Sequence, residues 1–425
     1  MKLWNKEGNI DKIIEKYTIG NDPEFDQRLA KYDVMGSLAH AKMLYQIDYL
    51  TGEEYQQLKK GLAAILKKVE DGSFEIEPGV EDVHSQVEFM LINQFGEVGK
   101  KLHVGRSRND QIAVDLKLYY RHALQTIKDK LKALSLVFLD KAEQTKHILM
   151  PGYTHSQAGM VSSFGLWYGS FAESIADDYR LCAHILEQVD QNPLGSAAGY
   201  GSSLPNDRDF TTKELSFSGL CVNSMYAQMT RGKAELLIGQ LFSTIALTIN
   251  RFASDICIFS NENYRFLKLP DTYTTGSSIM PHKKNPDVLE LTRAKCNQLA
   301  TTASRIQILL SNMQSGYHRD YQLLKEILFP EIDRMQDVLD VVIYCIPIIE
   351  EKEDIMNDEK YKLCYTVENI NARVKAGEAF RDAYHSVKKE VNKNSFVPLK
   401  KVEHSHLGSL GNLGIGRIKQ KLSWK

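Results

Sequence analysis

The chain has 425 residues, 43% hydrophobic and 25% charged, which is a globular composition and excludes a disordered chain. Lys and Arg number 53 against 54 Asp and Glu, so a net charge of −1 gives no general electrostatic reason to bind nucleic acid or an acidic membrane. The six cysteines are scattered without a C-x-x-C pair, and the N-terminal MKLWNKEGNIDKIIEK lacks the apolar core of a signal peptide. We therefore expect a cytoplasmic protein with reduced thiols.

The predicted elements are almost all helices. Shorter helices are expected over the first hundred residues, where Gly52, Gly72 and Gly79 interrupt the pattern. Apolar residues then recur every three or four positions over 112–138, 235–259 and 289–313, each as one helical face. A further helix is expected from about Ser156 to Gln188, and the alternation typical of half-buried strands is hard to find.

This pattern predicts a mainly α protein with a central bundle of long helices. The long gaps between prolines agree, because proline would break a helix interior. We expect an N-terminal helical domain over 1–104, the long-helix bundle over 105–345 and a small helical domain over 346–425. The 235–259 helix is apolar around much of its circumference, which favours burial inside a homo-oligomer, although a single long bundle would also bury it.

Three polar segments interrupt the helices. In KLHVGRSRNDQ, Arg106 and Arg108 precede a helix, where positive charge opposes the helix dipole unless an anion binds there. MPGYTHSQ places His155 next to candidate helix-capping hydroxyls, and this segment alone favours a structural role for the histidine over a catalytic one. LPDTYTTGSSIMPHKKNPDVLE is a long loop carrying hydroxyls, His282 and two lysines; a functional loop and a solvated surface loop are about equally favoured.

Two other classes of site find little support. His84 and Glu88 share a helical face, but a metal site needs a third ligand at suitable spacing and none is evident. A serine hydrolase is excluded because no G-x-S-x-G elbow is present and the α/β pattern that it needs is absent.

Several of these motifs together resemble a known family. GSSIMPHKKNP (276–286) resembles the signature of the fumarase/aspartase superfamily, and GRSRNDQ, PGYTHSQ and GSLAHAKML resemble its argininosuccinate lyases. The resemblance implies three helical domains, a homotetramer around a 20-helix core and active sites built from three subunits. It also implies reversible elimination of argininosuccinate to arginine and fumarate, the last step of arginine biosynthesis, on a small-molecule substrate without a metal or organic cofactor.

The resemblance further implies roles for individual residues. Ser277 matches the family's catalytic base, His155 its proton donor and Glu290 the carboxylate that orients the donor, while Lys283 and Asn285 match positions that hold a fumarate-side carboxylate. His84 matches a histidine near the site. The remaining matches are to substrate-binding positions: Ser107, Arg108, Asn109, Thr154, Arg231, Tyr317, Gln322 and Lys325.

The sequence departs from the family at three informative positions. Asp22 stands where a substrate-binding serine is expected, Tyr226 where an aspartate is usual, and His282 where this subfamily has glutamine. Two alternatives therefore stay open. One is a lyase that releases fumarate from another N-substituted aspartate, such as adenylosuccinate, and the other is a non-catalytic structural protein like the related δ-crystallins.

Overall fold

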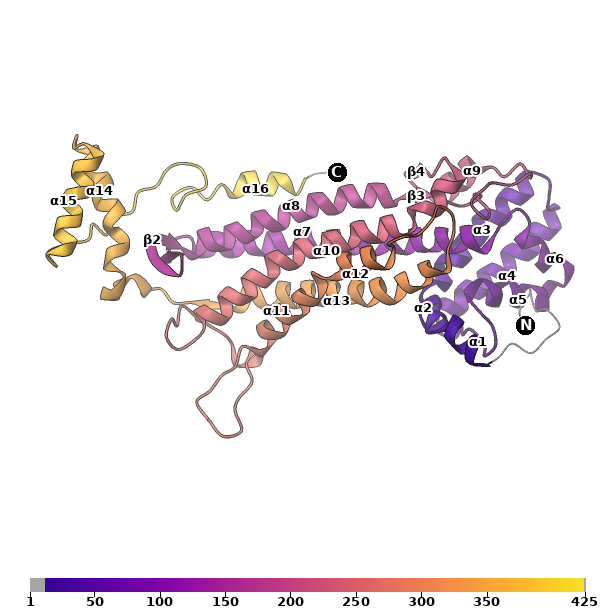
Figure 1. Cartoon of the computed structure of the whole chain (residues 1–425), viewed down its shortest axis with the longest axis horizontal. Coiled ribbons are helices and arrows are strands. Elements are labelled where there is room, and N and C mark those ends of the chain that lie inside the picture. The colour runs from indigo at the N-terminus through magenta and orange to yellow at the C-terminus, as the bar shows by residue number, and fades with distance from the viewer. Residues whose placement is uncertain (1–11, 424–425) are drawn as a thin grey trace. The chain divides into compact units, whose positions relative to one another are not determined.

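The computed structural model describes residues 12–423, and helices form most of its regular structure (Figure 1). The predicted mainly α class is confirmed. The chain divides into two units, each assembled from three separate segments. Unit 1 runs to Ile127 and adds Cys182–Ser243 and Leu299–Met335, while unit 2 comprises Lys128–Leu181, Thr244–Gln298 and the chain from Gln336 onward. The expected three-domain division along the chain stays a prediction.

Four long helices contribute residues to both units: α7 (Arg108–Thr145), α8 (Phe164–Val189), α10 (Ser224–Phe259) and α13 (Leu323–Cys345). The α7 and α10 helices correspond to the periodic runs predicted over 112–138 and 235–259. By length and composition alone α10 is apolar enough to cross a membrane, but 56% of its most apolar stretch is buried inside the protein. That degree of burial is typical of the core helix of a globular protein.

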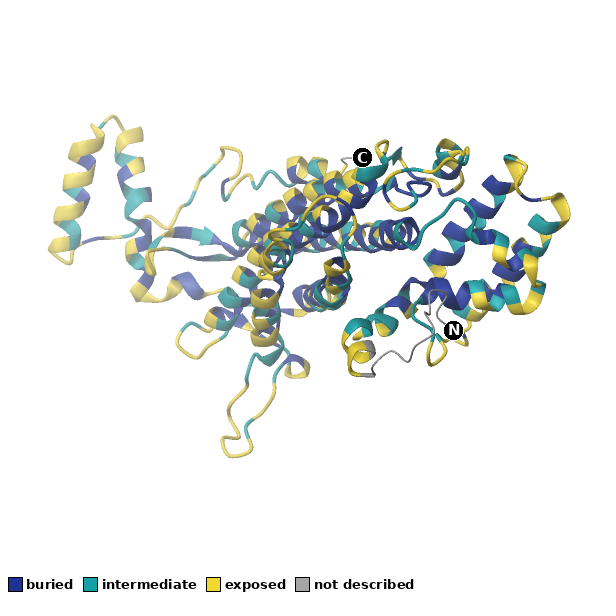
Figure 2. Ribbon diagram, turned by 45° about the vertical axis from the view of Figure 1, so that its right-hand side comes forward, coloured by how far each residue is buried: buried dark blue, intermediate teal, exposed yellow. Residues whose placement is uncertain are grey.

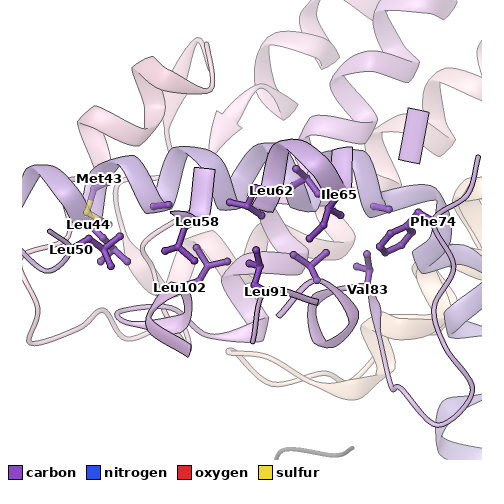
Figure 3. Close-up of a cluster of buried hydrophobic side chains, with 14 residues drawn as sticks. Met43, Leu44, Leu50, Leu58, Leu62, Ile65, Phe74, Val83, Leu91 and Leu102 are labelled. Carbon is purple, nitrogen blue, oxygen red and sulfur yellow. The ribbon is translucent and has the colours of Figure 1, made fainter. Parts of the chain in front are cut away.

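Unit 1 holds shorter helices, of which six lie in the N-terminal part of the chain and two come from its later segments: α1 (Lys12–Ile19), α2 (Asp22–Asp26), α3 (Ala30–Gln46), α4 (Gly52–Glu70), α5 (Val83–Phe95), α6 (Glu97–Lys100), and then α9 (Arg208–Glu214) and α12 (Thr302–Leu309). The α4 helix begins with a capping box, in which Thr51 and Glu54 satisfy each other's backbone amides. Apolar residues of α3, α4 and α5 form a buried cluster that includes Leu44, Leu58 and Leu91 (Figure 3). This cluster packs α3, α4 and α5 together, and α5 carries His84, which borders the cavity described below.

Unit 2 contains α11 (Asp287–Leu299, assigned to this unit up to Gln298), α14 (Thr366–Lys375), α15 (Phe380–Asn392) and α16 (Ile415–Lys421). The predicted single helix over 289–313 is wrong, because α11 ends at Leu299 and α12 begins again at Thr302. The periodicity continues across this break, so apolar spacing alone did not reveal it.

Strands are short and pair in twos. The parallel pair of β3 (Gln191–Asn192) and β4 (Gly219–Leu220) lies in unit 1, and the antiparallel pair of β5 (Leu267–Lys268) and β6 (Glu350–Glu351) lies in unit 2. The longest pair is the hairpin of β1 (Leu149–Thr154) and β2 (Gln157–Ser163). The helix expected from Ser156 therefore begins later, at Phe164, after the hairpin.

Candidate active site

A polar cavity of about 220 Å³ lies in unit 1. Seven of the predicted site residues line it: His84, Arg108, Asn109, Arg231, Tyr317, Gln322 and Lys325. They come from α5, α7, α10, α13 and the turn before α13, so segments far apart in sequence meet here. Ser107 lies beside them, and its backbone N–H donates to Asp110 at 2.8 Å in the first turn of α7.

Asp110 fixes the start of α7 next to the cavity. Its side chain is fully buried and also accepts hydrogen bonds from the backbone N–H groups of Gly195 and Ala197, each at 3.0 Å. Burial raises the pKa of Asp110 to about 6, although these three amide donors favour the ionised form. Asp110 thus connects the GRSRNDQ segment to a second loop and positions Arg108 and Asn109.

Lys325 is an almost buried cation of the cavity, with 3% of its side chain exposed. Its Nζ lies 2.6 Å from Asp22 Oδ1 and 2.5 Å from Asp26 Oδ1. These two carboxylates raise the pKa of Lys325 in spite of its burial. Burial, together with the neighbouring charge of Asp26, raises the pKa of Asp22 to about 6 even though Lys325 opposes this change. Asp22, one of the departures from the family pattern, therefore lines the cavity and contacts a predicted substrate-binding residue.

A break in α10 places Arg231 at the cavity. The helix is interrupted at Arg231 (ψ 138°) and Gly232 (φ +82°), a conformation that glycine adopts without strain. Glu235 accepts the freed Gly232 N–H at 2.6 Å, and a side chain at position 232 would meet Leu310 at 2.5 Å. Arg231 then donates to the carbonyl of Tyr321 at 3.1 Å and lies over the Tyr321 ring.

Hydrogen bonds hold other parts of the cavity wall. Gln322 Nε2 donates to the carbonyls of Thr18 and Ile19 at 3.2 and 2.9 Å, so the end of α1 lies against the turn before α13. Arg108 donates to Glu81 at 3.1 Å and to Ser85 at 2.8 Å. The cavity therefore combines several cations with several carboxylates, which suits a ligand that carries charges of both signs.

The structure also reveals two functional candidates that the sequence reasoning missed. Asp33 of α3 and Asp115 of α7 flank His84 of α5, with their carboxylate oxygens 2.8 and 3.5 Å from its Nδ1. The imidazole and carboxylate atoms lie within 4.8 Å of one another. The 2.8 Å contact has the length of a hydrogen bond, and we interpret the group as an ion-pair cluster. No spacing rule could find it, because the three residues lie on three separate helices.

The other predicted residues lie in unit 2, beginning with the β1–β2 hairpin. His155 (φ +52°) and Ser156 (φ +61°) form its two-residue turn, and Thr154 ends β1. Positive φ at both turn positions is the geometry of a type I′ hairpin turn, and histidine enters this region more readily than most residues. Thr154 and His155 are exposed at the tip of the hairpin.

The signature segment 276–286 forms a long loop between β5 and α11 that extends away from the helices in Figures 1 and 2. Thr275 and Asn285 pair through their backbones at 3.2 and 2.9 Å and close the base of this loop. Ser277 is half-buried, and its Oγ accepts from the backbone N–H groups of Ile279 and Met280 at 3.4 and 3.2 Å. Lys283 is exposed near the tip.

Glu290 lies in the first turn of α11 with an exposed side chain. Within the described part of this chain, Glu290 and His155 form no hydrogen bond with each other, and neither is bonded to Ser277. The structure therefore brings together the substrate-binding candidates of unit 1 in one cavity. It places the candidate base, acid and orienting carboxylate on separate segments of unit 2, as Figure 1 shows for the hairpin and the loop.

Comparison with known proteins gives consistent results. A family model described as Lyase matches residues 5–300. A protein named argininosuccinate lyase from Bacteroides thetaiotaomicron is 49% identical over 412 residues, which cover 97% of this chain and 92% of the relative. Another of that name, from Thermotoga neapolitana, is 40% identical and covers 91% of this chain and 97% of the relative.

Among solved structures, an EDDS lyase in complex with formate matches with a TM-score of 0.76 at 22% identity, covering 95% of this chain and 83% of that one. At this identity the similarity establishes the fold alone. The family model and the near-full-length relatives, however, go further than the fold. The chain belongs to the argininosuccinate lyase family.

Proposed function

We propose that this protein is an enzyme that catalyses the reversible β-elimination of argininosuccinate to arginine and fumarate. The observation that carries the proposal is the mixed-charge cavity of unit 1, in which Arg108, Arg231 and Lys325 meet Asp22 and Asp26. Argininosuccinate carries several carboxylates, an ammonium and a guanidinium. A cavity with fixed groups of both signs can pair with each of them. The names of the near-full-length relatives support the same substrate.

The elimination requires a base, an acid and a site for developing negative charge. A proton leaves the carbon beside a carboxylate, and the resulting dianion needs oriented donors and cations. We assign Ser277 as the base, because the N–H groups of Ile279 and Met280 already donate to its Oγ and would stabilise an alkoxide. Lys283 and Asn285, on the same loop, would bind the carboxylate on the fumarate side.

We assign His155 as the acid that protonates the departing guanidino nitrogen, and Glu290 as the carboxylate that orients it. His155 is exposed at the tip of a rigid hairpin turn, an arrangement that suits a side chain presented to another part of an assembly. Because His155 and Glu290 do not contact each other within the described chain, we further propose that they meet across a subunit interface.

We propose that the assembly is a homotetramer with composite active sites. Large apolar side chains are exposed on several helices, including Leu247 (56% exposed) of α10, Leu291 (63%) of α11 and Ile308 (75%) of α12. Exposed apolar residues of this kind are typical of surfaces that pack against further copies. We also propose a cytoplasmic location, since the six cysteines form no disulfide among the described residues and five of them are buried.

The decisive experiment measures fumarate release by ultraviolet absorbance from argininosuccinate and, separately, from adenylosuccinate. Turnover of argininosuccinate alone is expected. Release of fumarate only from adenylosuccinate would replace the proposed substrate. A well-folded protein that releases fumarate from neither compound would instead favour a structural role like that of δ-crystallin. Mixing two different inactive single-site variants tests the composite site, because active sites should reappear in mixed tetramers.

A further inference from the structure

We propose that Asp33 and Asp115 are positioning residues that hold His84 as a fixed cation in the wall of the unit 1 cavity, where its charge helps to bind an anionic group of the substrate. This inference rests on the proposed function, because it takes a substrate with several carboxylates as the ligand. It concerns two residues that would act through His84 and would not themselves touch the substrate.

The geometry of the cluster favours a positive charge on the His84 ring. Asp33 is 2% exposed and Asp115 is fully buried, so both carboxylates have lost their hydration. His84 Nδ1 donates to Asp33 Oδ1 at 2.8 Å and lies 3.5 Å from Asp115 Oδ2. Asp33 Oδ2 and both oxygens of Asp115 have no hydrogen-bond partner among the described residues. Burial, together with the charge of Asp33, raises the pKa of Asp115 well above its usual range, although His84 and Arg106 oppose this change. A neutral imidazole would leave the buried Asp33 carboxylate without a counter-charge at contact distance, whereas an imidazolium provides one.

The charged groups around the cluster favour the same protonation state. Burial by itself would lower the pKa of His84, but the hydrogen bond to Asp33 and the charges of Asp33, Asp115 and Asp82 raise it to about 9. Arg106, Arg108 and Glu88 also lie close by, and Arg106 is held by Ser37 Oγ at 3.1 Å. The neighbouring His103 has no such carboxylate contact. Burial, Arg106 and Arg108 lower the pKa of His103 to about 4.

The His84 ring lies where its positive charge can contact a bound substrate. His84 lines the cavity together with Arg108, Asn109 and Lys325, although only 6% of the residue is exposed. Its Nδ1 is occupied by Asp33, so Nε2–H is the remaining donor of the imidazolium. A doubly protonated ring that cannot rotate away from Asp33 keeps that donor in one orientation, and a charge-assisted hydrogen bond to a substrate carboxylate is stronger than a neutral one.

The test combines a titration with kinetics on the full-length protein. Histidine is labelled with ¹³C at Cε1, and the His84 signal is assigned with His84→Gln. In the wild type, this signal should remain that of the imidazolium at pH 8 and should titrate near pH 9. Asp33→Asn and Asp115→Asn should move the midpoint towards the ordinary value of about 6.5. Asp209→Asn, an exposed carboxylate on α9 of the same unit, should leave it unchanged.

The kinetic measurement separates positioning from general damage. With argininosuccinate, Asp33→Asn and Asp115→Asn should raise KM by roughly ten- to hundredfold with a smaller effect on kcat. The increase in KM relative to the wild type should be larger above pH 7 than below it. A KM that rises equally at every pH would indicate a merely structural role and would overturn the proposal.

Three other outcomes are also decisive. A wild-type His84 that titrates at or below about 6.5 would overturn the proposal, and this measurement does not depend on any variant folding. Stoichiometric metal found in the protein by elemental analysis and lost in His84→Gln would overturn it in favour of a metal site. If the wild type released no fumarate from argininosuccinate, the proposed function would fail, whereas the titration would still decide whether His84 is a fixed cation.

Discussion

Lys325 offers the most direct test of how the cavity is held together, through the substitution Lys325→Met. Methionine keeps most of the volume and the unbranched shape of lysine, so packing around the side chain should survive. The charge is removed, and Asp22 and Asp26 lose the ammonium group that lies 2.6 and 2.5 Å from them. Because Asp26 is 1% exposed, water cannot replace that group.

The expected loss of stability follows from the two carboxylates that lose their counter-charge. Removing one partner of a buried ion pair typically costs about 3 to 5 kcal/mol. A carboxylate can avoid a buried unpaired charge by taking up a proton, which at pH 7 costs about 4 kcal/mol, roughly three pKa units at about 1.36 kcal/mol each. At pH 5 the free-energy cost of the same protonation is about 2 to 3 kcal/mol lower. Protonation of Asp22 contributes less to the loss of stability, since the pKa of Asp22 is already raised to about 6.

The free energy of unfolding of wild type and Lys325→Met is therefore measured in urea at pH 7 and pH 5. We expect a loss of about 3 to 5 kcal/mol at pH 7 and a clearly smaller loss at pH 5. Lys42→Met is the control, because Lys42 pairs with Glu214 on the surface and its loss should change stability little at either pH. A loss below about 1 kcal/mol at pH 7, or an equal loss at both pH values, would refute the reasoning.

Three further predictions concern turnover, backbone and pH. Ser277→Ala should abolish fumarate release while substrate still binds by calorimetry, and His155→Asn should slow release by roughly 10²- to 10⁴-fold; activity near wild type would remove either residue from its role. Gly232→Ala should destabilise the protein by at least about 1 kcal/mol in thermal unfolding and weaken substrate binding, because the backbone has φ +82° and Leu310 lies 2.5 Å from the added carbon. Because the pKa of His84 is raised to about 9, protonated His84 stabilises the folded state fully below about pH 6.5, and this stabilisation is lost as pH rises through 9. The free energy of unfolding of the wild type should therefore fall by roughly 3 kcal/mol over this range, whereas that of His84→Gln should not.

Much of the architecture could be predicted from local patterns. The apolar spacing of 112–138 and 235–259 predicted helices that lie within α7 (Arg108–Thr145) and within the part of α10 that follows its break at Gly232. Helical periodicity is a property of neighbouring residues, so it can be read without knowing what packs against the helix. The short motifs around Ser107, His155 and Ser277 likewise identified the segments that carry polar chemistry, because each lies contiguously in a loop or turn.

Local patterns failed where distant segments decide the structure. The hairpin at 149–163 was missed because its turn is His155–Ser156 and lacks the Asn-Gly or Asp-Gly pair that usually marks a type I′ turn. The break between α11 and α12 was missed because the apolar spacing continues through it.

In the candidate site, too, some features follow from local sequence and others from the tertiary structure. The sequence by itself determined which residue types were present and which short segments concentrated them. Only the tertiary structure decided that Asp22 and Asp26 pair with Lys325, some 300 positions away along the chain, and that Asp33 and Asp115 enclose His84. Ion pairs of this kind depend on which helix faces meet and on the exclusion of water between them, and neither property is encoded in the spacing of residues along one segment.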